Sequence, residues 1–358
     1  MATEKPGSTP FALTPPGQRP GWSWWGAVIG AAILLLLFPE TAELDVLYDT
    51  SILFVFAILA LSMGYLWGFV GILSLGQTAF FALGGYTYAV LSLNTGETTG
   101  AALAAIALPA AFAALLGYFM IYGRISDIYL SVITLVVTLI LEKGIRATSG
   151  EQFVIGSVRL NGQNGIPGLP ALQVPWDPGT TLFIDGVYYL AAVLLVLVYV
   201  GLRLLLTTDF GRVLVGIREN ERRVNLLGYD SRRYKLAVFT LCGGIAGLAG
   251  VLYAVWGAFV APEMANLNQA ALLIIWVIVG GRTALVGPVI GTALIVYLTN
   301  WLGTQGVGQV TLVMGAILTV FVLVFRRGLV PTLSEALVWL QEKLRESRPQ
   351  QGGGEQRP

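Results

Sequence analysis

Side chains able to do acid–base, nucleophilic or metal chemistry are scarce in this sequence. It contains no histidine, so the commonest general base and metal ligand is missing and a Ser/His/Asp triad cannot be built. The single cysteine, Cys242, cannot form an intramolecular disulfide. None of the lysines follows a glycine, which excludes a phosphate-binding loop ending in Gly-Lys-Ser or Gly-Lys-Thr. We therefore expect no catalytic residues, no metal and no cofactor, and a membrane-embedded enzyme is the least favoured interpretation.

The densest group of polar side chains lies in residues 207–235, between two strongly apolar stretches. Its central residues are Arg218, Glu219, Asn220 and Glu221. Its apolar residues recur near helical spacing, at Val213, Ile217, Val224 and Leu227. This pattern predicts a short amphipathic helix, with Gly228 as a suitable C-terminal cap. Such a helix either docks in a groove of a soluble partner or lies at the lipid head groups, and the residues alone leave both alternatives open.

Polar and small residues inside the apolar stretches form a second group of candidates. The amide of Gln77 needs a hydrogen-bond partner in the protein or in a water-filled path, so it either holds helices together or lines a pathway. Glycine pairs interrupt apolar segments at Gly84, Gly85, Gly280 and Gly281. Small residues let membrane helices approach closely, and broken helices also surround the pathways of transporters. These residues are therefore pathway candidates, with helix packing as the alternative.

A third group lies in the long polar stretch 143–182. Its Asn-Gly and Pro-Gly steps are typical of tight turns, because glycine accepts a positive φ and proline has a fixed one. The candidate residues are Asn161, Gly162, Asn164 and Gly165. A turn of this kind is either a rigid surface loop or an outer gate and docking surface.

The elements that must hold these residues are apolar helices. Apolar residues make up 56% of the chain and charged residues 11%, whereas an ordinary soluble domain carries about 25% charged residues. Apolar stretches alternate with polar breaks near residues 22–38, 47–66, 76–93, 100–122, 126–142, 183–206, 236–258, 269–281, 285–303 and 308–325. The sequence therefore predicts an all-α, polytopic transmembrane helical bundle of about ten spans, with glycine-broken helices.

Composition also divides the chain into segments. Residues 1–21 are rich in Pro, Gly and Thr and are predicted to be a disordered tail, followed by a membrane domain at 22–327. Residues 328–346 fit an amphipathic C-terminal helix, and residues 347–358 a second disordered tail. The net charge of +1 provides no broad basic surface, so nucleic acid is not an expected partner.

The distribution of basic residues gives the bundle an orientation. With both termini in the cytoplasm, 18 of the 21 lysines and arginines fall on the cytoplasmic side, as the positive-inside rule predicts. The exceptions, Lys143, Arg146 and Arg159, lie in the long outer loop. Glu142 lies near the outer end of a span and is expected to be exposed to water. No chain of acids crosses the apolar stretches, which disfavours an ion-coupled secondary transporter.

Several longer stretches carry a recognisable order of residues. They are 67–86 (WGFVGILSLGQTAFFALGGY), the polar run 210–239, 244–254 (GIAGLAGVLYA), 279–291 (VGGRTALVGPVIG) and the turn 161–168 (NGQNGIPG). In sequence and spacing they resemble the permease subunits of branched-chain amino-acid ABC importers, which are closely related to the urea and short-amide ABC permeases. The resemblance covers most of residues 45–327.

The resemblance implies a non-enzymatic subunit of the cytoplasmic membrane that translocates branched-chain or other amino acids. It implies a second homologous permease, two ATP-binding cassette ATPase subunits and an extracytoplasmic substrate-binding protein as partners. Residues 207–235 would form the cytoplasmic coupling loop, with ATPase contacts at Arg218, Glu219, Asn220, Glu221 and Gly228. Urea or short amides are the alternative substrates. The family signature has an alanine pair where this sequence has Arg222 and Arg223, so these contact roles are a hypothesis.

Overall fold

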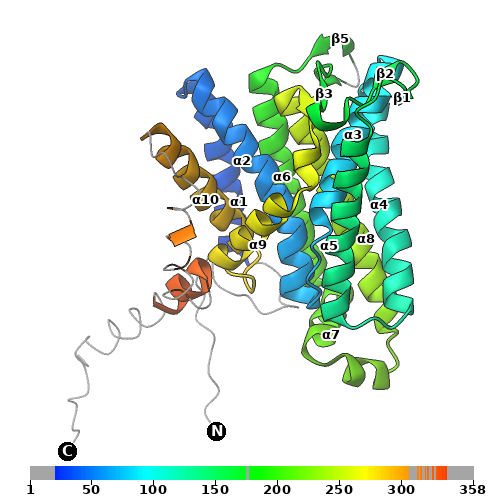
Figure 1. Ribbon diagram of the computed structural model, residues 1–358. Helices are drawn as coiled ribbons and strands as arrows, with labels where there is room; N and C mark the ends of the chain where they lie inside the picture. Colours follow the sequence, from blue (N-terminus) through cyan, green and yellow to red (C-terminus); the bar gives the residue numbers. More distant parts are fainter. Residues whose placement is uncertain are drawn as a thin grey trace, which may run out of the picture.

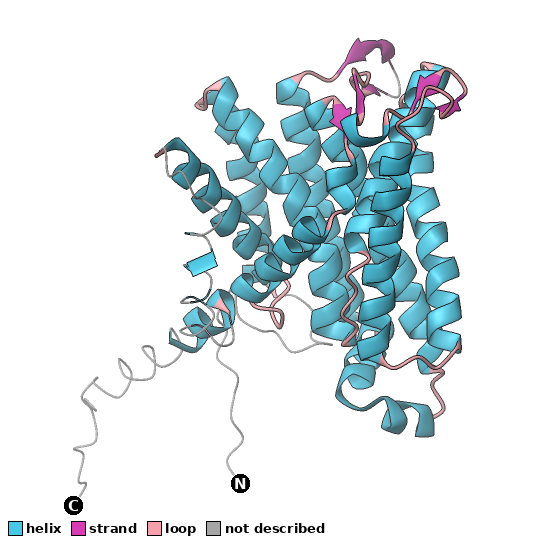
Figure 2. Cartoon of the chain, viewed as in Figure 1, coloured by secondary structure: helices cyan, strands magenta, loops and turns pink. Residues whose placement is uncertain are grey.

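The computed structural model describes residues 21–174, 177–305 and 328–336, together with 313, 315, 316, 319, 321 and 325. These residues form a bundle of helices with short strands gathered at one end (Figures 1 and 2). The predicted helical bundle is confirmed. The N-terminal tail up to residue 20, most of the expected span 308–325 and the end of the chain from residue 337 lie outside the described residues.

The elements have the following bounds. The α-helices are α1 Trp22–Leu37, α2 Leu44–Tyr65, α3 Gln77–Thr95, α4 Thr99–Tyr122, α5 Asp127–Ala147, α6 Ile184–Thr207, α7 Asp209–Leu226, α8 Ser231–Gly257, α9 Leu267–Gly280 and α10 Gly287–Thr304. The shorter helical turns are η1 Phe38–Glu40, η2 Leu66–Val70, η3 Gly162–Asn164 and η4 Pro262–Ala265. The strands are β1 Val154–Ile155, β2 Val158–Arg159, β3 Ile166–Pro167, β4 Gln173–Val174, β5 Asp177–Thr181 and β6 Phe259–Val260. Residues 329–336 are also helical.

The expected ten spans are not confirmed. In the described part of the chain, 6 helices are long and apolar enough to cross a membrane. They are Trp22–Glu40, Leu44–Val70, Thr99–Tyr122, Asp127–Ala147, Ile184–Thr207 and Ser231–Gly257. Helices α3, α9 and α10 form where helices are predicted but do not meet these criteria. The 14 residues of α9 reach only about 21 Å, less than the roughly 30 Å of a bilayer core.

Helix α2 is the centre of the bundle because it is apolar on all sides and can be covered on all sides. Ala57 to Met63 are without exposed surface, and the helix packs against α6, α8 and α10. Helix α1 contrasts with it, since α1 has no buried residue and packs on α6. There the hydroxyl of Tyr188 donates a hydrogen bond to the carbonyl of Leu35 at 3.0 Å.

Glycines set the close approach of α8 to its neighbours α3 and α4. A Cβ on Gly250 would overlap the carbonyl of Phe81, and a Cβ on Gly247 would lie 2.8 Å from the ring of Pro109. Because no side chain separates the backbones, these helices pack at short range, as small residues allow in membrane bundles.

The expectation of an all-α chain needs one correction. The polar stretch after α5 forms short antiparallel pairs, β1 with β2 and β4 with β5, while β3 pairs with β6 after α8. Five of the six described strands have 2 residues each. Such strands are too short to show the alternating pattern that identifies a strand in a sequence. The strands lie at the end of the bundle opposite α7 (Figure 1).

Candidate functional site

The first part of the site is a break between α2 and α3. Helix α2 continues into the π-helical turn η2, which ends at Gly71 with a φ of +88°, a conformation that favours glycine. Residues 71–76 are not helical, and α3 begins at Gln77. Single π-helical turns inside α-helices are frequent at functional sites.

Hydroxyl groups of α5 form hydrogen bonds with the backbone groups of this break. Ser131 donates to the carbonyl of Leu73 at 2.7 Å, and Thr138 donates to that of Leu75 at 3.0 Å. The amide of Leu75 donates to the hydroxyl of Thr134 at 3.1 Å. Non-helical backbone is tolerated at membrane depth only where protein or water provides such partners. The break is therefore stabilised by α5, which is hydrogen-bonded to the residues between η2 and α3.

Gln77 lies at this break with no exposed surface. Its Oε1 accepts a hydrogen bond from Ser62 of α2 at 3.2 Å, which joins the two helices. Its Nε2 has no hydrogen-bond partner within the described ranges. The structure thus places this pathway candidate beside the broken helix, with one half of its amide used in a helix contact.

The glycine candidates lie in helix contacts. Gly84 packs against the backbone of Gly247, and a Cβ on Gly85 would lie 2.8 Å from Cε of Met264. Gly280 meets the backbone of Gly287 where α9 turns into α10, and Gly281 has a φ of +103°. Gly84, Gly85 and Gly280 therefore lie in close contacts, while a role of the four glycines in a pathway stays a prediction.

The second part of the site is α7, at the other end of the bundle from the strands (Figure 1). Thr208 caps its start by accepting a hydrogen bond from the amide of Gly211 at 3.3 Å. Asn220 has φ −161° and ψ 93°, so α7 consists of two helical parts. The side chain of Asn220 starts the second part by accepting from the amide of Arg223 at 2.9 Å. Gly228 follows with a φ of +91°, as its predicted role as a cap requires.

The apolar side of α7 differs from the predicted one at its end. Ile217 and Val224 are buried as expected, and Leu214 is buried with them. Leu227, in contrast, is 71% exposed and its neighbour Leu226 is 83% exposed. Leu226 is the last residue of α7, and Leu227 already lies in the turn that leads to Gly228, so the helical spacing that holds through Val224 does not extend to Leu227.

Arg218 connects α7 to the break in α2. Its Nη1 donates a hydrogen bond to the carbonyl of Gly68 in η2, and its Nη2 pairs with Glu219 at 2.6 Å. The side chain also covers Gly71, where a Cβ would lie 3.1 Å from Cγ of Arg218. A second arginine, Arg282, lies over the ring of Trp67 in the same turn, 5.3 Å from its centre. The sequence resemblance predicts Arg218 as a contact of the ATPase, which stays a prediction, and sequence reasoning missed this intramolecular contact.

Glu221 connects α7 to α8 and α5. It accepts hydrogen bonds from Lys235 at 2.7 Å and from Ser231 at 2.8 Å, and Lys235 also pairs with Asp127 at 3.5 Å. Burial alone would raise the pKa of Glu221, but these hydrogen bonds, with the charges of Lys235 and Arg232, outweigh it and lower the pKa below its ordinary value. A cleft of about 430 Å³ lies beside this cluster, between the start of α5, α7 and α8.

The turn at residues 161–165 has a defined backbone conformation and close contacts. Asn161 has a φ of +52°, its carbonyl accepts from the amide of Asn164 at 2.9 Å, and Gly165 has a φ of +70°. Gly162 is buried against Ser149, and Gly165 lies against the carbonyl of Val260 in β6. Asn161 and Asn164 are exposed. The turn therefore presents two amide side chains to the surroundings from a fixed backbone.

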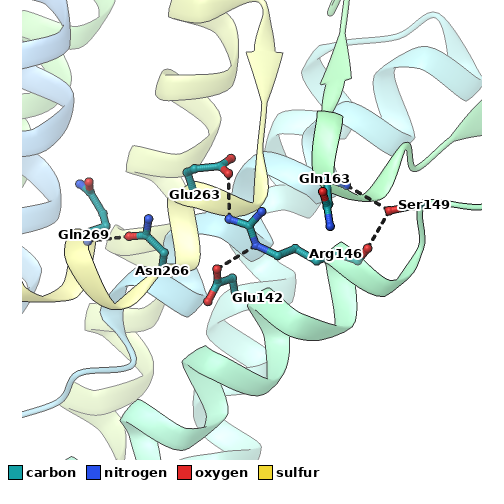
Figure 3. A network of polar contacts seen from close by, with 7 residues as sticks. All are labelled: Glu142, Arg146, Ser149, Gln163, Glu263, Asn266 and Gln269. Carbon is teal, nitrogen blue, oxygen red and sulfur yellow. Dashed lines mark hydrogen bonds and ion pairs between the residues drawn. The ribbon is translucent and has the colours of Figure 1, made fainter.

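A charged network lies near this turn, at the end of α5 (Figure 3). Arg146 donates to Glu142 at 2.9 Å and to Glu263 in η4 at 2.8 Å. The expectation that Glu142 is exposed to water is wrong, because only 6% of it is exposed. Its spacing of four residues from Arg146 was a signal for a pair, since such residues share a helix face. Next to the network, Asn266 caps α9 by accepting from the amide of Gln269 at 2.7 Å.

The described residues contain no group of three or more His, Cys, Asp and Glu side chains able to hold a metal ion. The site has three parts: a polar helix at one end of the bundle, a broken helix that is hydrogen-bonded to it, and a charged network at the opposite end. A bundle with 6 helices long and apolar enough to cross a membrane among its described residues defines a polytopic membrane protein.

Comparison with known proteins shows the family. The family described as branched-chain amino acid transport system / permease component matches residues 46–325, so the chain belongs to this family. The permease LivM of Escherichia coli K12, of the high-affinity branched-chain amino acid transport system, is 28% identical over 291 residues, covering 75% of this chain and 66% of that protein. LivM of Salmonella typhimurium LT2 is 30% identical over 267 residues, covering 68% and 60%.

Another relative is named for a different substrate. The ribose import permease RbsC of Escherichia coli K12 is 30% identical over 219 residues, covering 58% of this chain and 62% of that protein. The chain thus spans about two thirds or less of the length of these relatives. No solved structure matches it significantly. The family of transport permeases is therefore shown, in agreement with the resemblance seen in the sequence.

Proposed function

We propose that this chain is the transmembrane permease subunit of an ABC importer in the cytoplasmic membrane, and that α7 couples ATP hydrolysis by a partner to the membrane bundle. The observation that carries the proposal is the hydrogen bond from Arg218 to Gly68. It ties a polar helix at one end of the bundle to the point where α2 is interrupted. A displacement of α7 therefore acts on η2 and on the adjoining non-helical residues 71–76, whose backbone is hydrogen-bonded to α5.

The exposed end of α7 supports a docking role. Leu226 and Leu227 are apolar, adjacent and exposed, and the surrounding Arg222 and Arg223 are exposed as well. An exposed apolar patch with a charged rim is typical of a protein interaction site. We place this end in the cytoplasm because of the positive-inside distribution of basic residues, and expect two ATPase subunits, a second homologous permease and an extracytoplasmic binding protein as partners.

A cysteine cross-link tests the coupling role. With a cysteine at Leu226, we expect a disulfide or short bifunctional cross-link to the cognate ATPase in the assembled complex. The native Cys242 is buried and adds little background. A cysteine at Glu151, at the opposite end of the bundle, is the matched control. The proposal fails if Leu226 gives no cross-link, or if an ion gradient without ATP drives uptake by this chain alone.

For the substrate, we propose branched-chain or other amino acids. The match to the LivM permeases covers more of this chain than the match to the ribose permease, 75% against 58%. Urea and short amides are the alternative. Titration of the cognate binding protein with leucine, urea and acetamide separates them, because the binding protein delivers the substrate.

A further inference from the structure

The charged network around Arg146 lies at the end of the bundle that carries the strands, and its members differ in exposure. Glu263 is the most accessible member, with 54% of its side chain exposed, followed by Arg146 with 26% and Glu142 with 8%. The three side chains come from α5 and η4, which are more than a hundred residues apart in the chain. They converge from two sides in Figure 3. The network therefore leads from the surface into the protein.

The charges of this network do not balance. Two carboxylates share one guanidinium, which leaves one negative charge in excess. The guanidinium has five N–H donors, of which two serve the glutamates. The network can therefore still accept one cationic group at Glu263 and one anionic group at Arg146.

A buried hydroxyl next to the network points to a ligand. Tyr86 of α3 is 8% exposed, and its hydroxyl has no hydrogen-bond partner in the part of the chain that the structure describes. Helix α3, which carries Tyr86, packs against η4, which carries Glu263. Its neighbour Gly85 packs against Met264 of η4. A buried hydroxyl without a partner is unfavourable unless it serves a group that is bound only part of the time.

We propose that Glu263, Arg146 and Tyr86 form an entry site for a zwitterionic α-amino acid. Glu263 receives the ammonium group, while Arg146 and the Tyr86 hydroxyl receive the carboxylate. The bound zwitterion replaces the pair between Arg146 and Glu263, which is the ionic link between α5 and η4. In the occupied site, α5 and the turn that precedes α9 are joined through the bound zwitterion and no longer directly. A neutral amide has no charges to exchange and leaves this link closed.

This proposal rests on the proposed function, so the test uses the assembled importer: this chain with its partner permease, ATPases and binding protein in proteoliposomes. We measure initial uptake of radiolabelled leucine over a range of concentrations, together with ATP hydrolysis. For Glu263→Gln and Tyr86→Phe, we expect KM to rise about tenfold, with ATP hydrolysis in the absence of leucine unchanged. Leucinamide, which lacks the carboxylate, should compete poorly with leucine in the wild type.

The controls separate recognition from folding. Glu151→Gln and Arg159→Gln break the exposed outer pair at 3.3 Å and should leave KM unchanged. Tyr86→Phe removes a hydroxyl that has no described partner to lose, so its thermal stability should equal or exceed that of the wild type. Wild-type uptake with unchanged KM in both Glu263→Gln and Tyr86→Phe overturns the entry site alone. Absence of leucine uptake by the wild-type complex overturns the proposed function and the entry site with it.

Discussion

Arg218 joins two points that are 150 residues apart in the sequence. Its guanidinium donates to a backbone carbonyl, so the contact depends on the arginine and not on the identity of the partner side chain. Gly68 lies near the end of η2, where backbone carbonyls have no donor from a following helical turn, and Arg218 donates a hydrogen bond to its carbonyl. This single side chain is the shortest connection between α7 and the broken helix.

Replacing Arg218 with alanine should uncouple the two elements. A hydrogen bond from a charged group contributes about 1.5–3 kcal/mol, which corresponds to a loss of at least about tenfold in uptake per ATP hydrolysed. The measurement is substrate uptake and ATP hydrolysis in proteoliposomes. Arg212→Ala is the matched control, because Arg212 pairs with the exposed Asp209 in the same helix. Equal coupling in both variants contradicts the role of Arg218.

Glu221 makes the position of α7 sensitive to pH. Its pKa is lowered from 4.5 in the folded protein, so its contacts with Lys235 and Ser231 stabilise the fold above that pH and are lost as the pH falls through the lowered value. A spin label on a cysteine at Leu227 should become more mobile upon acidification below 4.5. In Glu221→Gln the label should be mobile at neutral pH and show no such step. A step that persists in this variant assigns the transition to another group.

At the scale of elements, α8 is held by glycines that face α3 and α4. Their role is a steric one, so it can be tested with a single methyl group. Gly250 and Gly257 lie in the same helix, but a Cβ on Gly250 meets the backbone of Phe81, while a Cβ on Gly257 meets nothing within 4 Å. The two positions therefore form a matched pair.

Gly250→Ala should lower the stability of the protein by about 1–3 kcal/mol, because the added methyl forces α3 and α8 apart. Gly257→Ala should leave it nearly unchanged. Thermal unfolding of each variant in the same detergent measures the difference. Equal stability of the two variants would contradict the steric role of Gly250, because α3 and α8 would then accept the added methyl without strain.

At the scale of the whole molecule, α7 and the short strands mark opposite ends of the bundle (Figure 1). The positive-inside distribution predicts that α7 faces the cytoplasm. A membrane-impermeant maleimide should label a cysteine at Glu151 in intact cells, since 87% of that side chain is exposed. It should label a cysteine at Leu226 only after permeabilisation. The reversed pattern contradicts the orientation, and the unaltered chain, whose Cys242 is buried, gives the background.

Hydropathy and helical spacing are local properties, so the sequence by itself determined the helical bundle, the six long apolar helices, the cap at Gly228 and the family resemblance. The same local signals predict about ten spans, and this number is not confirmed: in the described residues 6 helices are long and apolar enough to cross a membrane, and α3, α9 and α10 do not meet these criteria. They also missed the two-residue strands, which have no periodicity of their own.

Contacts between distant residues were decided by the tertiary structure alone. The pair of Arg146 with Glu263 spans 117 residues, and that of Arg218 with Gly68 spans 150. Arg218 binds a backbone carbonyl, which every residue has, so the residue type at position 68 does not indicate the contact. The burial of Glu142 and the exposure of Leu227 likewise depend on what packs against them. A sequence records which side chains are polar or apolar, but ion pairs and orphan hydroxyls depend on distances of a few ångströms that only the packed helices define.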